Sequence, residues 1–256
     1  MRELSIRLRK LRNRAILVVL LMVFAGYISK STQQTDLAIV KAKGRLVMLT
    51  LPGPTTYFED GRGKNGFDYL LAKAFADSLG VELDVKVVPT LRRLLLSVGG
   101  PQGDFAAANL VKTAVRDKSL SFAKPYLEVT QKLIYRGGSK RPRSLDRLEG
   151  ELVVIADSSH SENLAKLKDE YPNLEWREQD NAEMSDLIRK VHDGEISYSV
   201  VDSLSYLINR HIYPKARSAM NISEPQPIAW AFPSHNDGTV LAAANAFLED
   251  YIASGE

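Results

Sequence analysis

One order of elements occurs twice in the chain, and it constrains the fold more than any other feature. Apolar runs of strand length alternate with helical patterns in the first third, and the same alternation starts again at residue 151. Strands separated by a helix usually run parallel, because the helix returns the chain to the edge where the first strand began. The sequence therefore predicts an α/β protein of two units, each a mainly parallel sheet flanked by helices.

The first unit contains the clearest amphipathic helix. Phe67, Leu71 and Phe75 recur at helical spacing, and Gly80 is expected to end that helix. The polar, irregular residues 29–43 that precede the unit are expected to be a linker. The elements expected in the first unit are strands over 45–51, 82–88 and 103–110 and helices over 66–80 and 91–98.

Two extended runs, 128–136 and 226–233, are expected to cross between the units. The final helix, 239–253, has no partner unless it packs back on the first unit. This order predicts two lobes joined by a hinge, with lobe 1 over 30–136 and 225–256 and lobe 2 over 137–224. The elements expected in the second unit are strands over 151–157, 174–179 and 196–202 and helices over 161–171, 182–193 and 203–210.

The first 29 residues have the pattern of a targeting segment. Six basic residues lie in the first fourteen positions, and an apolar run from Ala15 to Ile28 follows them. That run is short for a membrane span and has the length of a secretory signal, with a cleavage pattern ending at Ala25. An uncleaved N-terminal anchor is the alternative. Both interpretations predict an exported protein.

The charge distribution argues against nucleic-acid binding. The chain has 34 lysine and arginine residues and 31 acidic residues, but beyond the first fourteen positions 28 bases face 30 acids. A nucleic-acid-binding domain needs a basic surface, which this balance does not favour. The chain has no cysteine, and its four histidines lack metal-binding spacing, so we expect no disulfide, no metal site and no cofactor.

The candidate site lies in the loops that follow the strands. Ligands bind to open parallel sheets at the carboxyl ends of the strands, where loops lead into helices. Four such loops are expected, over 52–58, 107–116, 157–160 and 202–205, and they line one cleft if the lobes face each other. No residue in them is assigned a catalytic role. The candidate ligand-binding residues are Arg116, Asp202, Tyr57, Phe58, Asn109, Ser158 and Ser159.

The two charged candidates suit a ligand with a carboxylate and an ammonium group. Arg116 offers a planar fork to a carboxylate, and Asp202 can accept hydrogen bonds from an ammonium group. The alternative for Arg116 is a surface ion pair with Asp117 or Asp104. The alternative for Asp202 is a helix N-cap without a ligand.

The uncharged candidates also have two interpretations each. Ser158, Ser159 and His160 precede a helix whose free backbone N–H groups suit an anion or a carbonyl, but Ser158 can equally be an N-cap and His160 a surface residue. Tyr57 and Phe58 can cover an apolar side chain of the ligand, or only pack within their own loop.

Several segments in fixed order resemble the bacterial extracellular solute-binding proteins of the amino-acid-binding family, family 3. They are "GRLVML", "GFDYLLAKAFADSLGVELDV" and "GDFAAANLVKTAVRDKSLSFAKPY", with the family patterns G-F-D-x-x-L-A, T-x-x-R and F-x-x-P-Y. The resemblance implies a two-lobed periplasmic-binding-protein fold of type II, with a ligand between the lobes and roles for Arg116 and Asp202. Transport-type members carry a hydroxyl two residues before the threonine of T-x-x-R, where this chain has Val111.

Two further segments are similar to the N-terminal module of the membrane-bound lytic murein transglycosylase F family. They are R-P-R-S-L at 141–145 and E-x-Q-P-I-x-W at 224–230. In that family the module precedes a lysozyme-like domain that cleaves peptidoglycan through a catalytic glutamate. The resemblance implies an exported protein at the periplasmic side of the outer membrane. The chain ends at "YIASGE", before the motif that would carry the glutamate, so we expect this chain to bind and not to catalyse.

The ligand implied by this resemblance is a murein peptide or an amino acid, with peptidoglycan reached through the further domain and peripheral membrane contact. One alternative is a stand-alone amino-acid-binding protein of an ABC transporter. A second is a periplasmic dehydratase of the same fold, although the expected cleft loops offer Asp202 without an obvious acid–base partner.

Overall fold

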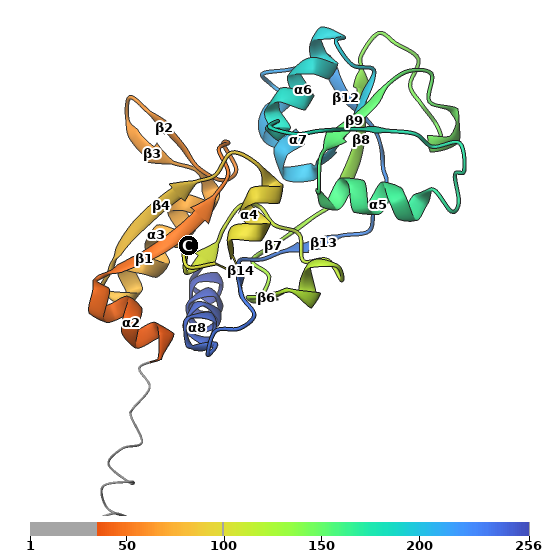
Figure 1. Ribbon diagram of the computed structural model, residues 1–256. Coiled ribbons are helices and arrows are strands. Elements are labelled where there is room, and N and C mark those ends of the chain that lie inside the picture. Colours follow the sequence, from red (N-terminus) through yellow and green to blue (C-terminus); the bar gives the residue numbers. More distant parts are fainter. Residues whose placement is uncertain (1–34, 99, 256) are drawn as a thin grey trace, which may run out of the picture. The chain divides into compact units, whose positions relative to one another are not determined.

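Two five-stranded sheets organise the computed structural model, which describes residues 35–98 and 100–255 (Figure 1). The expected signal peptide or anchor over residues 1–29 lies outside the described residues. Within the described ranges, no helix has both the length and the apolar character that a membrane span requires. The helices and two sheets confirm the predicted α/β fold class.

The first sheet has the strand order β4–β1–β5–β14–β6. β4 (Glu82–Val87), β1 (Arg45–Thr50) and β5 (Phe105–Ala106) are parallel, as the intervening helices α3 (Phe67–Leu79) and α4 (Leu91–Val98) require. β14 (Ala231–Pro233) runs antiparallel to β5 and to β6 (Leu120–Phe122), so a C-terminal segment completes this sheet.

Aromatic side chains fill one face of the first sheet. The ring of Phe75, on α3, lies 5.5 Å from that of Trp230 and 6.3 Å from that of Phe105. The C-terminal helix α8 (Thr239–Ser254) adds Phe247, whose ring is 5.4 Å from that of Phe75. The final helix therefore packs back on the first unit, and its apolar residues are buried in the core of that unit.

Residues expected to be part of a linker form the helix α2 (Asp36–Lys43), which lies beside α8 (Figure 1). The backbone N–H of Leu37 donates to Thr239 Oγ1 at 3.0 Å, and Val40 is buried in the same core as α8. The eight residues include five apolar ones, but so short a helix is marginal on its own, and packing against α8 supplies the rest of the stabilisation.

The second sheet has the strand order β10–β9–β11–β8–β12. β10 (Arg177–Gln179), β9 (Leu152–Ile155) and β11 (Tyr198–Asp202) are parallel, whereas β8 (Gln131–Arg136) and β12 (Ala216–Asn221) are antiparallel to their neighbours. The helices of this unit are α5 (Ser159–Leu167), α6 (Met184–Asp193) and α7 (Ser203–Asn209). Buried aliphatic residues on both faces of the sheet pack against them.

The connection between the units is a short antiparallel pair, β7 (Leu127–Val129) with β13 (Gln226–Ile228). The strand over 131–136, which the sequence analysis places at the end of lobe 1, instead pairs within the second sheet as β8. The expected run over 226–233 likewise divides into β13 and β14. Thr130 separates β7 from β8, and Ala229 and Trp230 separate β13 from β14. The sequence analysis read each pair as one strand, because the apolar pattern continues across the break.

The remaining elements are small and lie next to the site. β2 (Phe58–Asp60) and β3 (Gly63–Asn65) form a hairpin that the sequence analysis did not predict. The expected strand over 103–110 is reduced to β5, because the chain turns at Asn109, which has a positive φ of 50°. Two short 3-10 helices, η1 (Arg116–Lys118) and η2 (Leu145–Arg147), complete the described elements.

Candidate functional site

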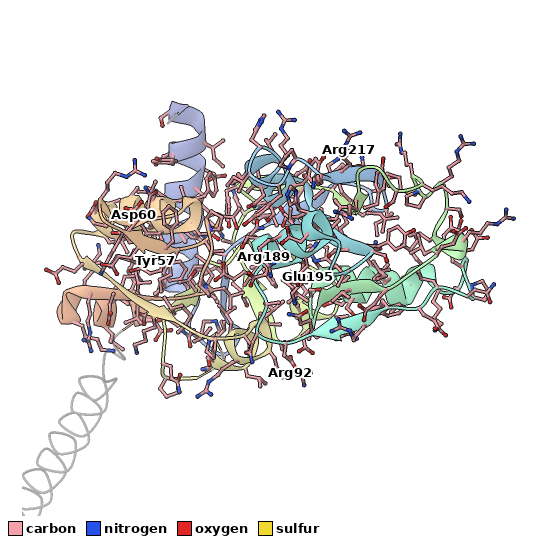
Figure 2. The ribbon with its side chains drawn as sticks, turned by 90° about the horizontal axis from the view of Figure 1, so that it is seen from above. Tyr57, Asp60, Arg92, Arg189, Glu195 and Arg217 are labelled. Carbon is pink, nitrogen blue, oxygen red and sulfur yellow. The ribbon has the colours of Figure 1, made fainter. Side chains whose placement is uncertain are left out.

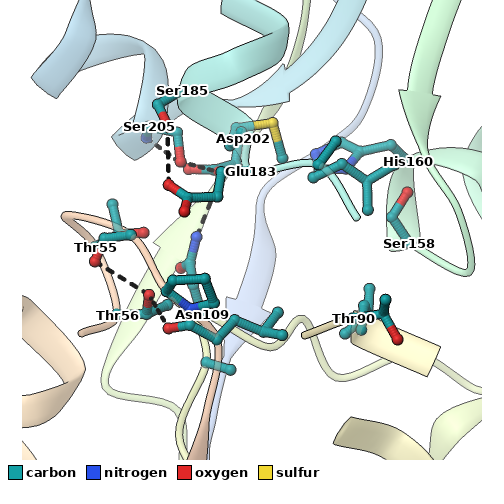
Figure 3. A pocket seen from close by; sticks show the side chains of 18 of the residues that line it. Thr55, Thr56, Thr90, Asn109, Ser158, His160, Glu183, Ser185, Asp202 and Ser205 are labelled. Carbon is teal, nitrogen blue, oxygen red and sulfur yellow. Dashed lines mark hydrogen bonds between the residues drawn. The ribbon is translucent and has the colours of Figure 1, made fainter. Parts of the chain in front are cut away.

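A cavity of about 210 Å³ lies where loops from the two sheets meet (Figure 3). Its wall contains residues of all four loops expected from the sequence, and the loops after β4 and β10 add to them. All these loops follow the carboxyl ends of parallel strands, the place where the fold directs ligands. The lining residues fall within 51–56, 89–92, 108–116, 155–160, 179–186 and 202–209, together with Ile228 of β13.

Asp202 is buried at the end of β11, where it caps α7. Its Oδ1 accepts the backbone N–H of Ser205 at 2.8 Å, and its Oδ2 accepts the Ser205 hydroxyl at 2.7 Å. The predicted N-cap role is therefore present. Asn109 also donates from Nδ2 to Asp202 Oδ2 at 3.3 Å, which joins a loop of the first sheet to the second (Figure 3). One lone pair of Oδ1 remains for a further donor.

A buried carboxylate that the sequence analysis did not select holds Asn109. Asp68, on α3, accepts the backbone N–H of Asn109 at 2.6 Å and the hydroxyl of Tyr126 at 2.5 Å. Burial raises the pKa of Asp68 to about 6, and the hydrogen bonds from Tyr126 and Asn109 oppose that rise. Asp68 thus fixes Asn109 in its left-handed conformation and aims the side-chain amide at Asp202. Two signals in the sequence point to Asp68: it is an acid inside an apolar helical pattern, and it is the acid of the family pattern G-F-D-x-x-L-A.

Arg116 is buried, with only 5% of its surface exposed. It donates from Nη1 to the carbonyl oxygen of Val111 at 2.9 Å and from Nη2 to that of Asp157 at 3.2 Å. Its Nε lies 3.7 Å from Glu162 Oε1, and burial lowers its pKa while Glu162 and Asp157 oppose that effect. Two N–H groups of the guanidinium, which was expected to bind a ligand carboxylate, therefore already bind carbonyl oxygens of the protein, one in each unit.

The alternative partners expected for Arg116 pair elsewhere. Asp117 forms an ion pair with Lys112 at 3.5 Å, and Asp104 accepts the backbone N–H of Val47 at 2.7 Å. The surface ion pair considered for Arg116 is therefore wrong in this structure. The guanidinium faces the wall of the cavity instead of the solvent.

The first turn of α5 lies beside Arg116 and also lines the cavity. Ser158 is its N-cap, because the Ser158 hydroxyl accepts the backbone N–H of Ser161 at 3.2 Å. Ser159 and His160 are buried and line the cavity. The surface position considered for His160 is therefore wrong: only 5% of the residue is exposed.

His160 also lacks a protein partner. Neither of its ring nitrogens forms a hydrogen bond with any residue that the structure describes. Burial lowers its pKa to about 4; the charge of Asp202 opposes this effect and that of Arg116 adds to it. His160 is consequently a neutral imidazole near neutral pH.

Tyr57 and Phe58 are not brought into the cavity with the other candidates. They line a shallow depression beside it, together with Pro54, Val87 and Glu183. The Tyr57 ring packs edge-on against Tyr69 at 5.5 Å, and its hydroxyl donates to Glu59 at 3.4 Å. These contacts agree with the loop-packing alternative.

Charged residues that the sequence analysis did not select also line the cavity. Arg92, at the surface of α4 (Figure 2), forms an ion pair from Nε to Asp157 Oδ2 at 2.8 Å. The cavity is also lined by three acidic residues at and before the start of α6, Asp180, Glu183 and Asp186. Among residues 35–98 and 100–255, no group of three histidine, cysteine or acidic residues could hold a metal ion.

The curated relatives that match most of this chain share one name. The proteins named membrane-bound lytic murein transglycosylase F from Saccharophagus degradans and Cellvibrio japonicus are 44% and 39% identical to it over 249 residues each. The matches cover 97% and 96% of this chain but 50% of each relative. The chain thus spans about half the length of the curated relatives it matches.

Solved structures share the fold at lower identity. A mutant of ArgBP from T. maritima superposes with a TM-score of 0.75 at 24% identity, covering 86% of this chain and 94% of that one. An ancestral amino-acid-binding protein, described as a precursor of cyclohexadienyl dehydratase, has a TM-score of 0.75 at 20% identity and covers 86% and 95%. Residues 46–256 match the bacterial extracellular solute-binding proteins, family 3, and the chain belongs to that family.

Proposed function

We propose that this chain is the ligand-binding module of an exported peptidoglycan lytic transglycosylase, and that it binds a murein peptide or an amino-acid-like molecule in its cavity. The observation that carries this proposal is the convergence of Arg116, Asp202 and His160 on one cavity, from loops of both sheets. A cationic fork and a carboxylate in one small cavity suit a ligand that carries both charges. The name shared by the relatives supports a peptidoglycan-derived ligand.

The proposed mechanism is a shift between conformations of the two lobes. A ligand that contacts Arg116 on one side and Asp202 on the other favours the state in which both contacts exist together. The bonds from Asn109 to Asp202 and from Arg116 to Asp157 already join the same loops, so the ligand adds to an existing interface. In a longer protein with a catalytic domain, this shift would regulate glycan cleavage at the periplasmic side of the outer membrane.

A thermal-shift screen tests the proposal, with murein tetrapeptide and the free amino acids as probes. A ligand at one hundred times its dissociation constant adds about 2.7 kcal/mol to the free energy of unfolding. Arg116→Lys and Asp202→Asn should each reduce the shift, because Lys loses the planar fork and Asn loses the charge but keeps the N-cap. Arg189→Ala is the matched control, since Arg189 forms exposed ion pairs on α6 (Figure 2) and does not line the cavity. No shift with any probe would refute the proposal.

A stand-alone binding protein of an ABC transporter is the second candidate, favoured by a specific structural likeness. A substrate-binding protein of an amino-acid ABC transporter from Streptococcus pneumoniae, solved with L-arginine, has a TM-score of 0.74 at 20% identity. That candidate predicts a thermal shift with a free amino acid and none with murein peptides. Sequencing the gene beyond codon 256 separates the two, because only the transglycosylase module is followed by an open frame for a lysozyme-like domain.

A further inference from the structure

The connection from β8 to β9 contains a sequence motif that the proposed function does not use. It includes R-P-R-S-L at 141–145 and runs over residues 137–151, with only the short helix η2 in it. Connections of this length are uncommon in compact domains unless they have a function or lack fixed structure. This connection is fixed, because Pro142 and Leu145 are buried and two N–H groups of Arg141 donate to the carbonyl oxygen of Ala219 on β12, from Nε at 3.0 Å.

A groove of about 890 Å³ lies along this connection. It shares no lining residue with the cavity of the candidate site, which has about 210 Å³. The larger, elongated lining suits a section of a polymer better than one small molecule. The groove is lined by four bases, two acids and a few uncharged residues: Lys140, Arg141, Arg143, Arg147, Asp146, Glu149, Pro142, Ser144, Tyr198, Ala219 and Met220.

The bases of the groove are only partly neutralised. Lys140 pairs with Glu149 at 3.3 Å and Arg147 with Asp146 at 3.6 Å, and both bases are more than four-fifths exposed, so these pairs are weak. The Arg143 side chain forms no ion pair or hydrogen bond with the part of the chain that the structure describes. Its free guanidinium offers a planar fork to an anionic group, of which carboxylate is one.

The mixture of charges indicates which kind of polymer fits. Free cations and two exposed carboxylates suit a partner that carries both carboxylate and ammonium groups. A lipid surface fits less well, because membrane-surface segments combine bases with apolar side chains that enter the bilayer. None of the large exposed apolar side chains of the described residues lies within 137–151.

We infer that this groove docks the chain on intact peptidoglycan, by binding carboxylates of the peptides that the glycan strands carry. The identity of the polymer rests on the proposed function, but the groove is a second surface and does not include the cavity. Arg217, on the edge strand β12 (Figure 2), packs against Gly137 and adds a further exposed base beside the start of the connection. Docking here would hold the module on the polymer while the cavity remains open to a small ligand.

Cosedimentation of the 256-residue chain with purified, insoluble peptidoglycan sacculi tests the inference. The unmodified chain should bind, and binding should weaken as the salt concentration rises. The triple variant Lys140→Ala, Arg143→Ala, Arg147→Ala should bind about tenfold more weakly, because three exposed charge interactions are lost together. Arg141 is kept, since it holds the connection on β12.

A second triple variant is the matched control. Arg62→Ala, Lys73→Ala, Lys124→Ala removes the same number of charges, each from an exposed ion pair in the first unit, and should bind sacculi like the unmodified chain. Soluble glycan strands should compete with the sacculi only while they carry their peptides. Circular dichroism and thermal unfolding show that both triple variants fold.

No binding of the unmodified chain to sacculi, or equal binding by the groove variant, would overturn the inference. Equal weakening in the two triple variants would overturn it too, because overall charge would then explain the binding. Cosedimentation with vesicles of phosphatidylglycerol and phosphatidylcholine, but not with sacculi, would assign the groove to a membrane surface instead. The proposed function is decided separately, since the thermal shift with murein tetrapeptide should persist in the groove variant.

Discussion

The two sheets bring their residues to the same cavity by different means. On the second sheet, Ser158 and Asp202 are each held by the turn that they cap, through bonds to the third residue along the chain. On the first sheet, Asn109 depends on Asp68, which lies 41 residues away in the sequence. One half of the site is therefore built from local contacts, and the other half from tertiary contacts in a buried core.

This difference predicts that substituting residues that support the first-sheet half of the site lowers stability more than substituting the caps of the second-sheet half. A local cap contributes about 1 kcal/mol, and its loss is confined to one helix end. A buried carboxylate that satisfies two donors affects stability and site geometry together, because its loss leaves both donors unpaired.

Asp68→Ala should have the largest effect. It leaves the Tyr126 hydroxyl and the Asn109 N–H without their acceptor in a buried environment, and should lower the free energy of unfolding by about 4 kcal/mol. Urea unfolding followed by circular dichroism measures this change. Asp77→Ala on the same helix is the control, since its exposed pair with Lys73 contributes only a few tenths of a kcal/mol. A similar loss in both variants would contradict the distinction.

The pH dependence of stability should separate the two halves next. The pKa of Asp68 is raised to about 6, so its contribution to stability is complete at low pH and is lost as pH rises from about 4 to 6. The pKa of His160 is lowered to about 4, so its contribution has the opposite sign and stability rises with pH over about 4 to 6.5. The two contributions have opposite signs, so in the unmodified chain they oppose each other.

Single variants should reveal each component of this pH dependence. Asp68→Asn should become more stable as pH rises from 4 to 6, because only the His160 component remains, while His160→Gln should become less stable over the same range. Unfolding midpoints measured across this range in both variants give the slopes. Parallel pH profiles in the two variants would show that these groups do not titrate as described.

Two substitutions of Asp202 separate the contribution of its helix cap to stability from that of its charge. Asp202→Ala removes the bonds to Ser205 and should lower the free energy of unfolding by about 1.5 kcal/mol, whereas Asp202→Asn keeps an N-cap and should lose less than half of that. Thermal unfolding of both variants measures the difference. An Asn variant as unstable as the Ala variant would mean that the charge, and not the cap, is the structural contribution.

Ser158→Ala should have the smallest effect, a loss of about 1 kcal/mol that is restored in Ser158→Asp, because Asp is an equally good N-cap at α5. The same thermal experiment measures it. A loss that Asp does not restore would show that Ser158 is held by more than its own helix, and would weaken the contrast between the two halves.

The same contrast explains what the sequence could and could not predict. The strands and helices of both units, and the loops that line the cavity, follow from periodicity and from the rule for parallel sheets. Ser158 and Asp202 could be predicted as caps because their partners lie in the next turn. Asp68 and Tyr126 lie in the family patterns G-F-D-x-x-L-A and F-x-x-P-Y, but their pairing could not be predicted, because they and Asn109 come together only in the folded core.

Tertiary context also decided the elements that were placed differently. Residues 36–43 form a helix because α8, two hundred residues later, offers a surface to pack on. The run over 131–136 joins the second sheet because β11 and β12 provide edges for it. The aromatic pair Tyr57 and Phe58 follows β1 as expected, yet the hairpin that starts at Phe58 directs it away from the cavity.

Hydrogen–deuterium exchange with and without murein tetrapeptide tests the central claim most directly. If the ligand bridges loops of both sheets, backbone amides within 107–116 and within both 157–160 and 202–205 should exchange more slowly in its presence. The exposed helix surface around Arg189 should be unchanged. Protection confined to one of the two sheets, or to neither, would contradict a ligand site shared by the two.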